Sequence, residues 1–254
     1  MEMCASVREC PSSGKSDDDV VRALAGIAQR VSVSDPAVEV WRVPLVGSAA
    51  ELERLAVLLS RDEHARAARF QFTGDRNRFI AGRGMLRVLL GNYVDAAPSA
   101  IAFASNPHGK PALADAALGV HFNLAHAGDI AIFAFARNRI PGVDIESLDR
   151  AVDHDALAQR FFSARECAEL QSLPHAARNR AFLTCWTCKE AVAKAIGRGL
   201  SLPLDQIEVT VGANPPRVLH MTHGDANEWT LYPVDAGSAY VATLAVHDAP
   251  LRTS

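Results

Sequence analysis

Two carboxylates that stand two residues apart are the first candidates for chemistry. Asp144 and Glu146 alternate with Val143 and Ile145, which is the pattern of a strand with one buried face. Side chains at positions i and i+2 of a strand point to the same side, so both carboxylates face one spot outside the core. Adjacent like charges are unfavourable unless a cation or an arginine neutralises them, and oxygen ligands in this arrangement suit Mg²⁺. Such pairs also occur on ordinary solvated strands, so the motif alone supports a metal site only weakly.

A third carboxylate, Glu190, lies in a predicted helix. Phe182, Trp186, Glu190 and Lys194 recur every fourth residue and therefore share one helix face. On a wet surface, Glu190 and Lys194 would form an ordinary ion pair. The two aromatic residues indicate instead that this face is packed, where a bare charge is costly. A role for Glu190 as a third metal ligand or a general base would explain it, and Lys189 and Lys194 would then supply point charges for phosphate oxygens.

Two further candidates, His126 and Lys110, lie in short turns between strand-like segments. The small residues around His126 leave room for a ligand to approach it, although a lone histidine is more often structural. Lys110 stands between Gly109 and Pro111, and turn chemistry alone would account for the glycine and the proline.

Arginines border the apolar stripe of the helix that follows Gly74. Residues 64–90 contain six arginines and one acid, whereas residues 141–170 contain seven acids and three arginines. The arginines either extend from the edge of a core into solvent or line a phosphate site. The functional interpretation places an anionic ligand on the first half of the chain, opposite a metal on the second.

The predicted helices and strands that position these residues occur in the same order in both halves of the chain. The first half has a strand at 38–45, helices at 51–70 and 75–94, and strands at 101–103, 121–124 and 130–136. The second half has a strand at 143–146, helices at 155–171 and 176–196, and strands at 207–211, 228–234 and 240–246. This pattern predicts an α+β (α/β) fold with two similar β-α-α-β-β-β halves, a pseudo-twofold axis and a cleft between the halves. We expect a leader over 1–37, lobes over 38–141 and 142–247, and a tail over 248–254.

The composition restricts the class of protein. The chain has 254 residues, of which 49% are hydrophobic, and a net charge of −3. These values fit a globular protein and give no indication of nucleic-acid binding. No apolar run is long enough for a membrane helix, and five cysteines, an odd number, suit a reducing cytosol. Only four of the 26 basic residues are lysines, and three of them, Lys110, Lys189 and Lys194, stand in the candidate segments.

Together, five segments resemble the Sfp-type 4′-phosphopantetheinyl transferase family over roughly residues 38–247. They are Gly109-Lys110-Pro111, Phe122-Asn123-Leu124-Ala125-His126, Gly142-Val143-Asp144-Ile145-Glu146, Phe161-Phe162-Ser163-Ala164-Arg165-Glu166, and Trp186-Thr187-Cys188-Lys189-Glu190-Ala191 with Lys194, Gly197, Gly199 and Leu200. Each motif is weak by itself, whereas five in the same order are highly specific. The family fold, two similar α/β halves in one chain, agrees with the repeated order of elements.

The resemblance implies an activity and a role for each matching residue. Such enzymes transfer the 4′-phosphopantetheine arm of coenzyme A to a serine of an apo acyl or peptidyl carrier protein, and release adenosine 3′,5′-bisphosphate. By motif, the metal ligands for Mg²⁺, or Mn²⁺ in its place, are Asp144, Glu146 and Glu190, and the catalytic residues are Glu190, Lys194 and Asp144. The residues expected to bind coenzyme A are Arg66, Arg78, Arg83, Lys110, Pro111, His126, Lys189 and Lys194.

One departure from the family pattern concerns His126. The family often has serine beside this histidine, whereas this chain has Ala125 and Ala127, so a hydroxyl contact to phosphate is missing. The expected mechanism has Glu190 accept the proton of the carrier serine, directly or through water. The sequence leaves open whether the carrier belongs to fatty acid, polyketide or nonribosomal peptide synthesis.

Two alternatives remain beside this hypothesis. One is another Mg²⁺-dependent phosphohydrolase or nucleotidyl transferase, although its usual additional acidic or Walker-type motifs are absent from the sequence. The other is a degenerate protein that binds coenzyme A or a carrier without catalysis, which the presence of all three acids argues against. We expect a cytoplasmic monomer with pseudo-dimeric halves, and no nucleic-acid or membrane partner.

Overall fold

The computed structural model describes residues 24, 26–150, 152–197 and 202–248. Most of the expected leader and the last six residues of the expected tail lie outside these ranges. Within the expected leader, β1 (Gln29–Val31) already pairs with β2 (Val38–Pro44), so the folded lobe begins before residue 38. Among the helices that the structure describes, none combines the length and the apolar composition that a membrane span requires.

The first half of the chain forms a four-stranded antiparallel sheet with helices on one side. The strand order is β1-β2-β6-β5, with β5 at Val120–Ala127 and β6 at Ile130–Arg137. The three helices are α2 (Ala49–Val57), α3 (Arg61–Ala68) and the long α4 (Thr73–Val94). A short hairpin, β3 (Phe103–Ser105) and β4 (Pro111–Leu113), follows α4.

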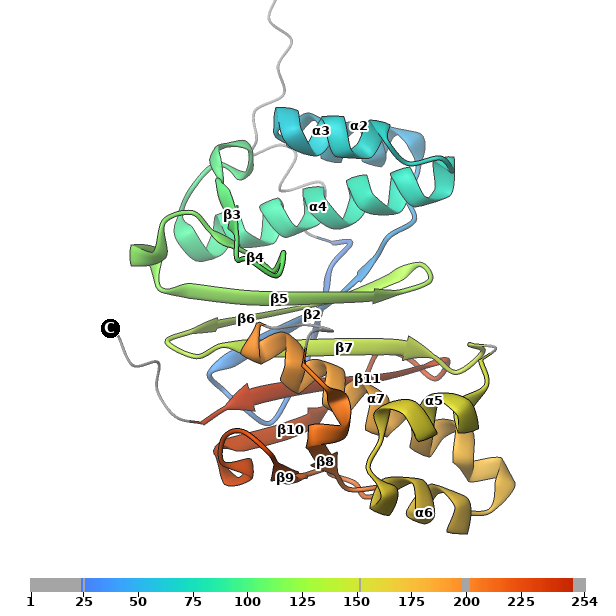
Figure 1. Ribbon diagram of the computed structural model, residues 1–254. Helices are drawn as coiled ribbons and strands as arrows, with labels where there is room; N and C mark the ends of the chain where they lie inside the picture. Colours follow the sequence, from blue (N-terminus) through green and yellow to red (C-terminus); the bar gives the residue numbers. More distant parts are fainter. Residues whose placement is uncertain (1–23, 25, 151, 198–201, 249–254) are drawn as a thin grey trace, which may run out of the picture.

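The second half repeats this order around a three-stranded antiparallel sheet, β10-β11-β7. Its strands are β7 (Pro141–Ser147), β10 (Trp229–Pro233) and β11 (Tyr240–His247). Its helices are α5 (His154–Phe161), α6 (Ala164–Ser172) and α7 (His175–Ile196), and its short hairpin is β8 (Ile207–Val209) with β9 (Val218–Met221). Figure 1 shows the two sheets side by side in the middle of the molecule, with the helices of each half on the outside.

The α+β fold class is confirmed, but the described residues of each half contain one more α-helix than predicted, with two additional strands in the first half and one in the second. The predicted helix at 51–70 is two helices, because Ser60 and Glu63 form a capping box that starts α3. Ser163 and Glu166 form the same box at the start of α6 and divide the predicted helix at 155–171. The additional strands, β1, β4 and β9, are only three, three and four residues long and carry little periodicity.

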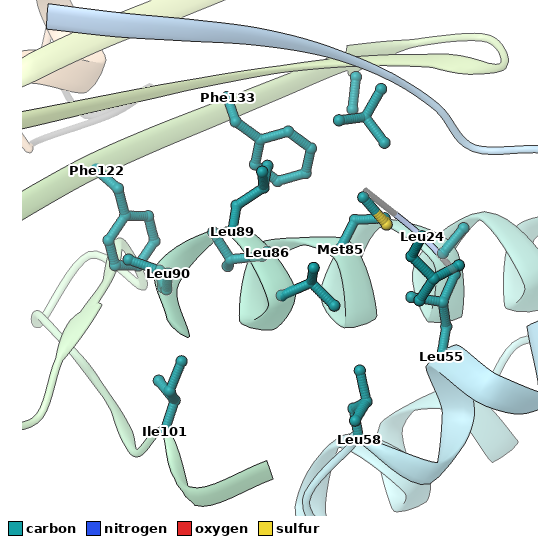
Figure 2. Close-up of a cluster of buried hydrophobic side chains, with 14 of the residues drawn as sticks. Leu24, Leu55, Leu58, Met85, Leu86, Leu89, Leu90, Ile101, Phe122 and Phe133 are labelled. Carbon is teal, nitrogen blue, oxygen red and sulfur yellow. The ribbon is translucent and has the colours of Figure 1, made fainter. Parts of the chain in front are cut away.

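Three apolar clusters hold these layers together. In the N-terminal half, α4 packs against the sheet, and Figure 2 shows Leu86 and Leu89 of this helix near Phe133 of the sheet and Leu90 near Phe122. A second cluster lies between α7 and the sheet of the C-terminal half. The third lies between the two sheets and includes Val143 and Ile145 of β7, so the two halves share a core.

Each half also contains the same buried polar arrangement. In the N-terminal half, Glu63 of α3 accepts a hydrogen bond from Nε of Arg87 at 2.8 Å, and Nη1 of Arg87 donates to the carbonyls of Pro98 and Ile101, both at 2.9 Å. In the C-terminal half, Glu166 of α6 lies 2.6 Å from Nζ of Lys189. Lys189 also donates to two carbonyls, those of Leu204 at 3.0 Å and Ile207 at 2.6 Å.

This arrangement corrects the expectation that Lys189 contacts phosphate. The Lys189 side chain is 0% exposed, and Glu166 is 1% exposed. With three oxygen partners around it, the ammonium has no donor left for a ligand. Lys189 is therefore a structural residue, the counterpart of Arg87 in the other half.

Replacing Lys189 tests this structural role. We expect Lys189→Met to lower the free energy of unfolding by about 3–5 kcal/mol, because Glu166 would remain as a buried charge without its partner. Urea denaturation followed by circular dichroism measures the loss, and Arg87→Met is the matched variant of the other half. A Lys189→Met protein of wild-type stability with a weakened affinity for coenzyme A would instead restore the phosphate role.

Candidate active site

Helix α7 lies directly on β7, and Gly142 permits this close approach. A Cβ atom at Gly142 would collide with the carbonyl oxygen of Ala191 and come within 2.6 Å of the amide nitrogen of Ala195. Because side chains alternate along β7, Asp144 lies on the same face as Gly142 and points toward α7. The contact between the two elements thus brings the acids of β7 toward Glu190 and Lys194 of α7.

Adding a methyl group at Gly142 tests how far this contact determines the site. We expect Gly142→Ala to cost about 3 kcal/mol or more in stability, because its clash is with backbone atoms that cannot rotate away. Transfer activity of the remaining folded protein should also fall, since α7 must move off β7. Gly82→Ala is the stability control, because its Cβ would meet only Leu45 Cδ2 at 3.4 Å. Equal melting temperatures for the two variants would refute the argument.

Asp144 is the most buried acid of the site. Its side chain is 8% exposed, and Oδ1 accepts a hydrogen bond from Nζ of Lys194 at 2.6 Å. Oδ2 is buried and has no hydrogen-bond partner among the described residues. Burial raises the pKa of Asp144, whereas the positive charge of Lys194 opposes this shift. One oxygen of this carboxylate is therefore free to bind a further positive group.

Glu146 and Glu190 lie near Asp144 and share its charge. Burial and the negative charge of Asp144 raise the pKa of both glutamates. Glu146 forms a short ion pair with Arg150, four residues later. Within the described part of the chain, the Glu190 carboxylate has no hydrogen bond or ion pair, and the residue is 7% exposed. An acid in such surroundings holds its proton more tightly than usual and is suited to proton transfer.

The three acids fit a divalent cation in their chemistry. Carboxylate oxygens are the ligands that Mg²⁺ prefers, and the unpartnered Oδ2 of Asp144 lacks the positive group that a cation would supply. In the present arrangement Lys194 and Arg150 neutralise Asp144 and Glu146. Among the described residues, no three metal-ligating side chains are close enough to form a ready-made metal site. The acids would have to turn away from the two basic side chains to bind a cation together.

A cavity of about 370 Å³ brings together four of the residues predicted to bind coenzyme A. Arg66, Arg78, Arg83 and His126 all line it, together with the apolar residues Leu45, Phe70, Phe79, Gly82, Leu86, Leu124, Ala131 and Phe133. Burial and the nearby charges of Lys194 and Arg78 lower the pKa of His126. His126 therefore lies near both the arginines of the cavity and the Lys194–Asp144 pair.

Two acids that pair with the cavity arginine Arg78 were not predicted from the sequence. Arg78 Nε donates to Oδ1 of Asp129 at 2.8 Å, and its Nη1 donates to Oδ1 of Asp75 at 3.0 Å. These acids raise the pKa of Arg78. Asp75 is three residues before Arg78 on α4, which is a recognisable helix spacing, whereas Asp129 lies in the distant β5–β6 turn and gives no sequence signal.

Lys110 and Pro111 lie where the two halves meet. Nζ of Lys110 donates to the carbonyl oxygen of Lys194 at 2.7 Å, at the C-terminal end of α7. Asn106 of the same turn donates to the carbonyl oxygen of Gly197 at 2.8 Å. Burial lowers the pKa of Lys110 to about 8. The turn thus fixes the end of the helix that carries Lys194, and contact of Lys110 and Pro111 with coenzyme A remains a prediction.

Comparison with known proteins gives one consistent family. Residues 141–245 match the family model described as the 4′-phosphopantetheinyl transferase superfamily, and residues 46–138 match the model for the N-terminal part of a 4′-phosphopantetheinyl transferase. The chain is 40% identical over 211 residues to the 4′-phosphopantetheinyl transferase HetI of Nostoc, covering 82% of this chain and 87% of HetI. It is 32% identical over 159 residues to the 4′-phosphopantetheinyl transferase Sfp of Bacillus subtilis, covering 63% of this chain and 69% of Sfp.

A solved structure is also similar, at a lower level. The crystal structure of the Thermotoga maritima holo-acyl-carrier-protein synthase AcpS matches with a TM-score of 0.36 and 19% identity, over 43% of this chain and 64% of that chain. The sequence relatives and the family models carry the assignment, because they extend over both halves of the molecule. The chain belongs to the 4′-phosphopantetheinyl transferase superfamily, whose members use coenzyme A as a substrate and modify carrier proteins.

Proposed function

We propose that this protein transfers 4′-phosphopantetheine from coenzyme A to a serine of an apo acyl or peptidyl carrier protein, and that the reaction requires Mg²⁺. The observation that carries the proposal is the position of one cluster of acids beside one basic cavity. Asp144, Glu146 and Glu190 lie around Lys194, and Lys194 is close enough to His126 of the cavity to lower its pKa. A substrate with a nucleotide at one end and a diphosphate next to it suits this arrangement, with the nucleotide in the basic cavity and the diphosphate beside Lys194 and the acids.

In the proposed reaction the serine oxygen attacks the phosphorus that bears the pantetheine arm. A new P–O bond forms to serine, and the bond from that phosphorus to the bridging oxygen of the diphosphate breaks. Glu190 accepts the serine proton, directly or through water; burial and the charge of Asp144 raise the pKa of this carboxylate in the metal-free protein. Adenosine 3′,5′-bisphosphate leaves with the bridging oxygen, and Lys194 stabilises the negative charge that develops there.

The acids have a second role in this proposal, as ligands. Asp144, Glu146 and Glu190 would hold Mg²⁺, which supplies Lewis-acid polarisation of the diphosphate when bound. Lys194 and Arg150, which now neutralise Asp144 and Glu146, would then be released toward the phosphate oxygens. His126 and the three cavity arginines would bind the nucleotide end, and their fixed positions would orient the diphosphate.

Lys194→Arg tests whether this position needs a compact charge. We expect kcat to fall about tenfold or more while the fold is retained, because a guanidinium fork is too broad for the place of the ammonium between Asp144 and the diphosphate. Steady-state kinetics beside a thermal melt measures both quantities. An unchanged kcat would mean that only the charge of Lys194 matters.

The direct test of metal dependence is removal and return of the ion. Full-length protein treated with EDTA is incubated with coenzyme A and a panel of apo acyl and peptidyl carrier proteins, and adenosine 3′,5′-bisphosphate is quantified by chromatography. Release should stop in EDTA and return with Mg²⁺. Undiminished release in EDTA would contradict the metal requirement without affecting the assignment of the transfer reaction.

We further propose a cytoplasmic monomer. The cysteines at 167, 185 and 188 are free thiols, which suits a reducing compartment. The third apolar cluster closes the two halves on each other within one chain. Sedimentation at micromolar concentration should give the mass of a single chain, and a larger mass would contradict the monomer.

A further inference from the structure

Beside the cavity, Glu63 contacts the cavity-lining Arg83 and the buried Arg87, and it has no role in the proposed chemistry. Its Oε2 accepts from the backbone N–H of Ser60 and from Nε of Arg87, both at 2.8 Å. Its Oε1 lies 3.3 Å from Nε of Arg83. Glu63 thus connects the capping box of α3 and the buried Arg87 to a side chain that lines the cavity.

Arg83 is held on one side and incompletely bonded on the other. Its guanidinium stacks over Phe103, with Cζ 4.9 Å from the ring centroid, and its Nε faces Glu63. Its Nη1 is buried without a hydrogen-bond partner among the described residues. Burial and the neighbouring charges of Arg66 and Arg87 lower the pKa of Arg83, and only Glu63 opposes this shift. Two guanidiniums, those of Arg83 and Arg87, share the one carboxylate of Glu63, and Arg66 adds a third positive charge near Arg83, so an anion would balance the excess.

The C-terminal half provides an internal comparison. Glu166 corresponds to Glu63, and Lys189 corresponds to Arg87. Oε1 of Glu166 accepts from the backbone N–H of Val209 at 2.8 Å, so both of its oxygens serve the fold. Cys185 stands four residues before Lys189, where the N-terminal half has Arg83 four residues before Arg87. The capping glutamate therefore bonds to a strand, at Val209, in the C-terminal half, and contacts the cavity arginine Arg83 in the N-terminal half.

We propose that Glu63 is a positioning residue that fixes the guanidinium of Arg83 for the 3′-phosphate of coenzyme A. The proposal rests on the function above, which places coenzyme A in this cavity. A guanidinium held by a carboxylate keeps one rotamer, so less conformational entropy is lost when phosphate binds. The 3′-phosphate is the group expected there, because a phosphate monoester carries the charge and the acceptors that a guanidinium fork binds best.

The test compares coenzyme A with 3′-dephospho-coenzyme A as donors to one apo carrier protein that the wild type modifies. We expect the wild type to prefer coenzyme A in kcat/KM. Glu63→Gln and Arg83→Gln should each reduce this preference about tenfold, mainly through KM for coenzyme A, which corresponds to about 1.4 kcal/mol. The double variant should prefer coenzyme A over 3′-dephospho-coenzyme A to the same extent as Arg83→Gln alone, because both changes act on one contact.

Glu166→Gln is the matched control, since it changes the equivalent capping box and buried ion pair of the other half. It should lower the melting temperature and leave the preference between the two donors unchanged. If Glu63→Gln does not fold, Glu63→Asp keeps a carboxylate beside Arg87 and should still reduce the preference. A preference retained in the folded Glu63 variant, or retained in Arg83→Gln, overturns the proposal. A wild type that transfers from neither donor would instead overturn the proposed function.

Discussion

Glu190→Gln should lower kcat for transfer about 10³-fold and leave the protein folded. The amide has nearly the shape of the carboxylate but cannot accept the serine proton, and a positioned general base contributes about 10²–10⁴ to a rate. If Glu190 also binds Mg²⁺ as proposed, the loss of this ligand would add to the effect. Because the carboxylate has no partner among the described residues, the substitution breaks no hydrogen bond or ion pair of the fold. Single-turnover kinetics with a carrier protein measures the loss of rate.

The same variant has a stability signature that follows from its pKa. The pKa of Glu190 is raised above its ordinary value of 4.5, so the folded protein favours the protonated form. The contribution of this group to stability is fully present below pH 4.5 and is lost as the pH rises through the higher folded pKa. In metal-free protein, Glu190→Gln should therefore melt at a higher temperature than the wild type at neutral pH, and this gain should disappear near pH 4. A large loss of stability at neutral pH would show that Glu190 supports the fold.

Asp144→Ala should lower transfer about 100-fold or more at a fixed Mg²⁺ concentration and shift the Mg²⁺ titration to higher concentrations. The change removes one of the proposed oxygen ligands and leaves Lys194 without its 2.6 Å partner, so the electrostatics of the site change in two ways. Initial rates across a Mg²⁺ series measure both effects. Glu228→Ala is the control, because it removes an acid that pairs with His247 at 3.2 Å, outside the site. An unchanged Mg²⁺ titration for Asp144→Ala would contradict its role as a ligand.

Much of the acidic cluster was predictable because its residues follow simple periods. The alternation in β7 predicted Val143 and Ile145 in the core and Asp144 on the opposite face, outside the core. The structure has Val143 and Ile145 in the core, whereas Asp144, on the opposite face, is buried against α7. The spacing of Phe182 and Trp186 on α7 correctly indicated a packed helix face. These predictions needed only the geometry of one strand and one helix.

Lys189 was misassigned because its partner is distant in sequence. α7 is buried on most sides, so its period does not show which polar residue has a partner and which faces a ligand. Glu166 lies in another helix, α6. The capping motif of Ser163 and Glu166 marks the start of α6, and the prediction of one helix over 155–171 did not take this motif into account. The shape of the cavity could not be predicted from the sequence either, because Arg66 and Arg83 come to line one cavity only when α3 packs on α4.

The central claim concerns what the protein does to a carrier. The most direct measurement is the intact mass of an apo carrier protein after incubation with coenzyme A, Mg²⁺ and the full-length chain, with a carrier that lacks the acceptor serine in parallel. We predict a mass gain of one 4′-phosphopantetheine that is absent from the serine variant and absent with Glu190→Gln. A carrier of unchanged mass, for every carrier in the panel, would contradict the account. Hydrolysis of coenzyme A in that case would indicate a phosphohydrolase, and binding of intact coenzyme A would indicate a protein that binds without catalysis.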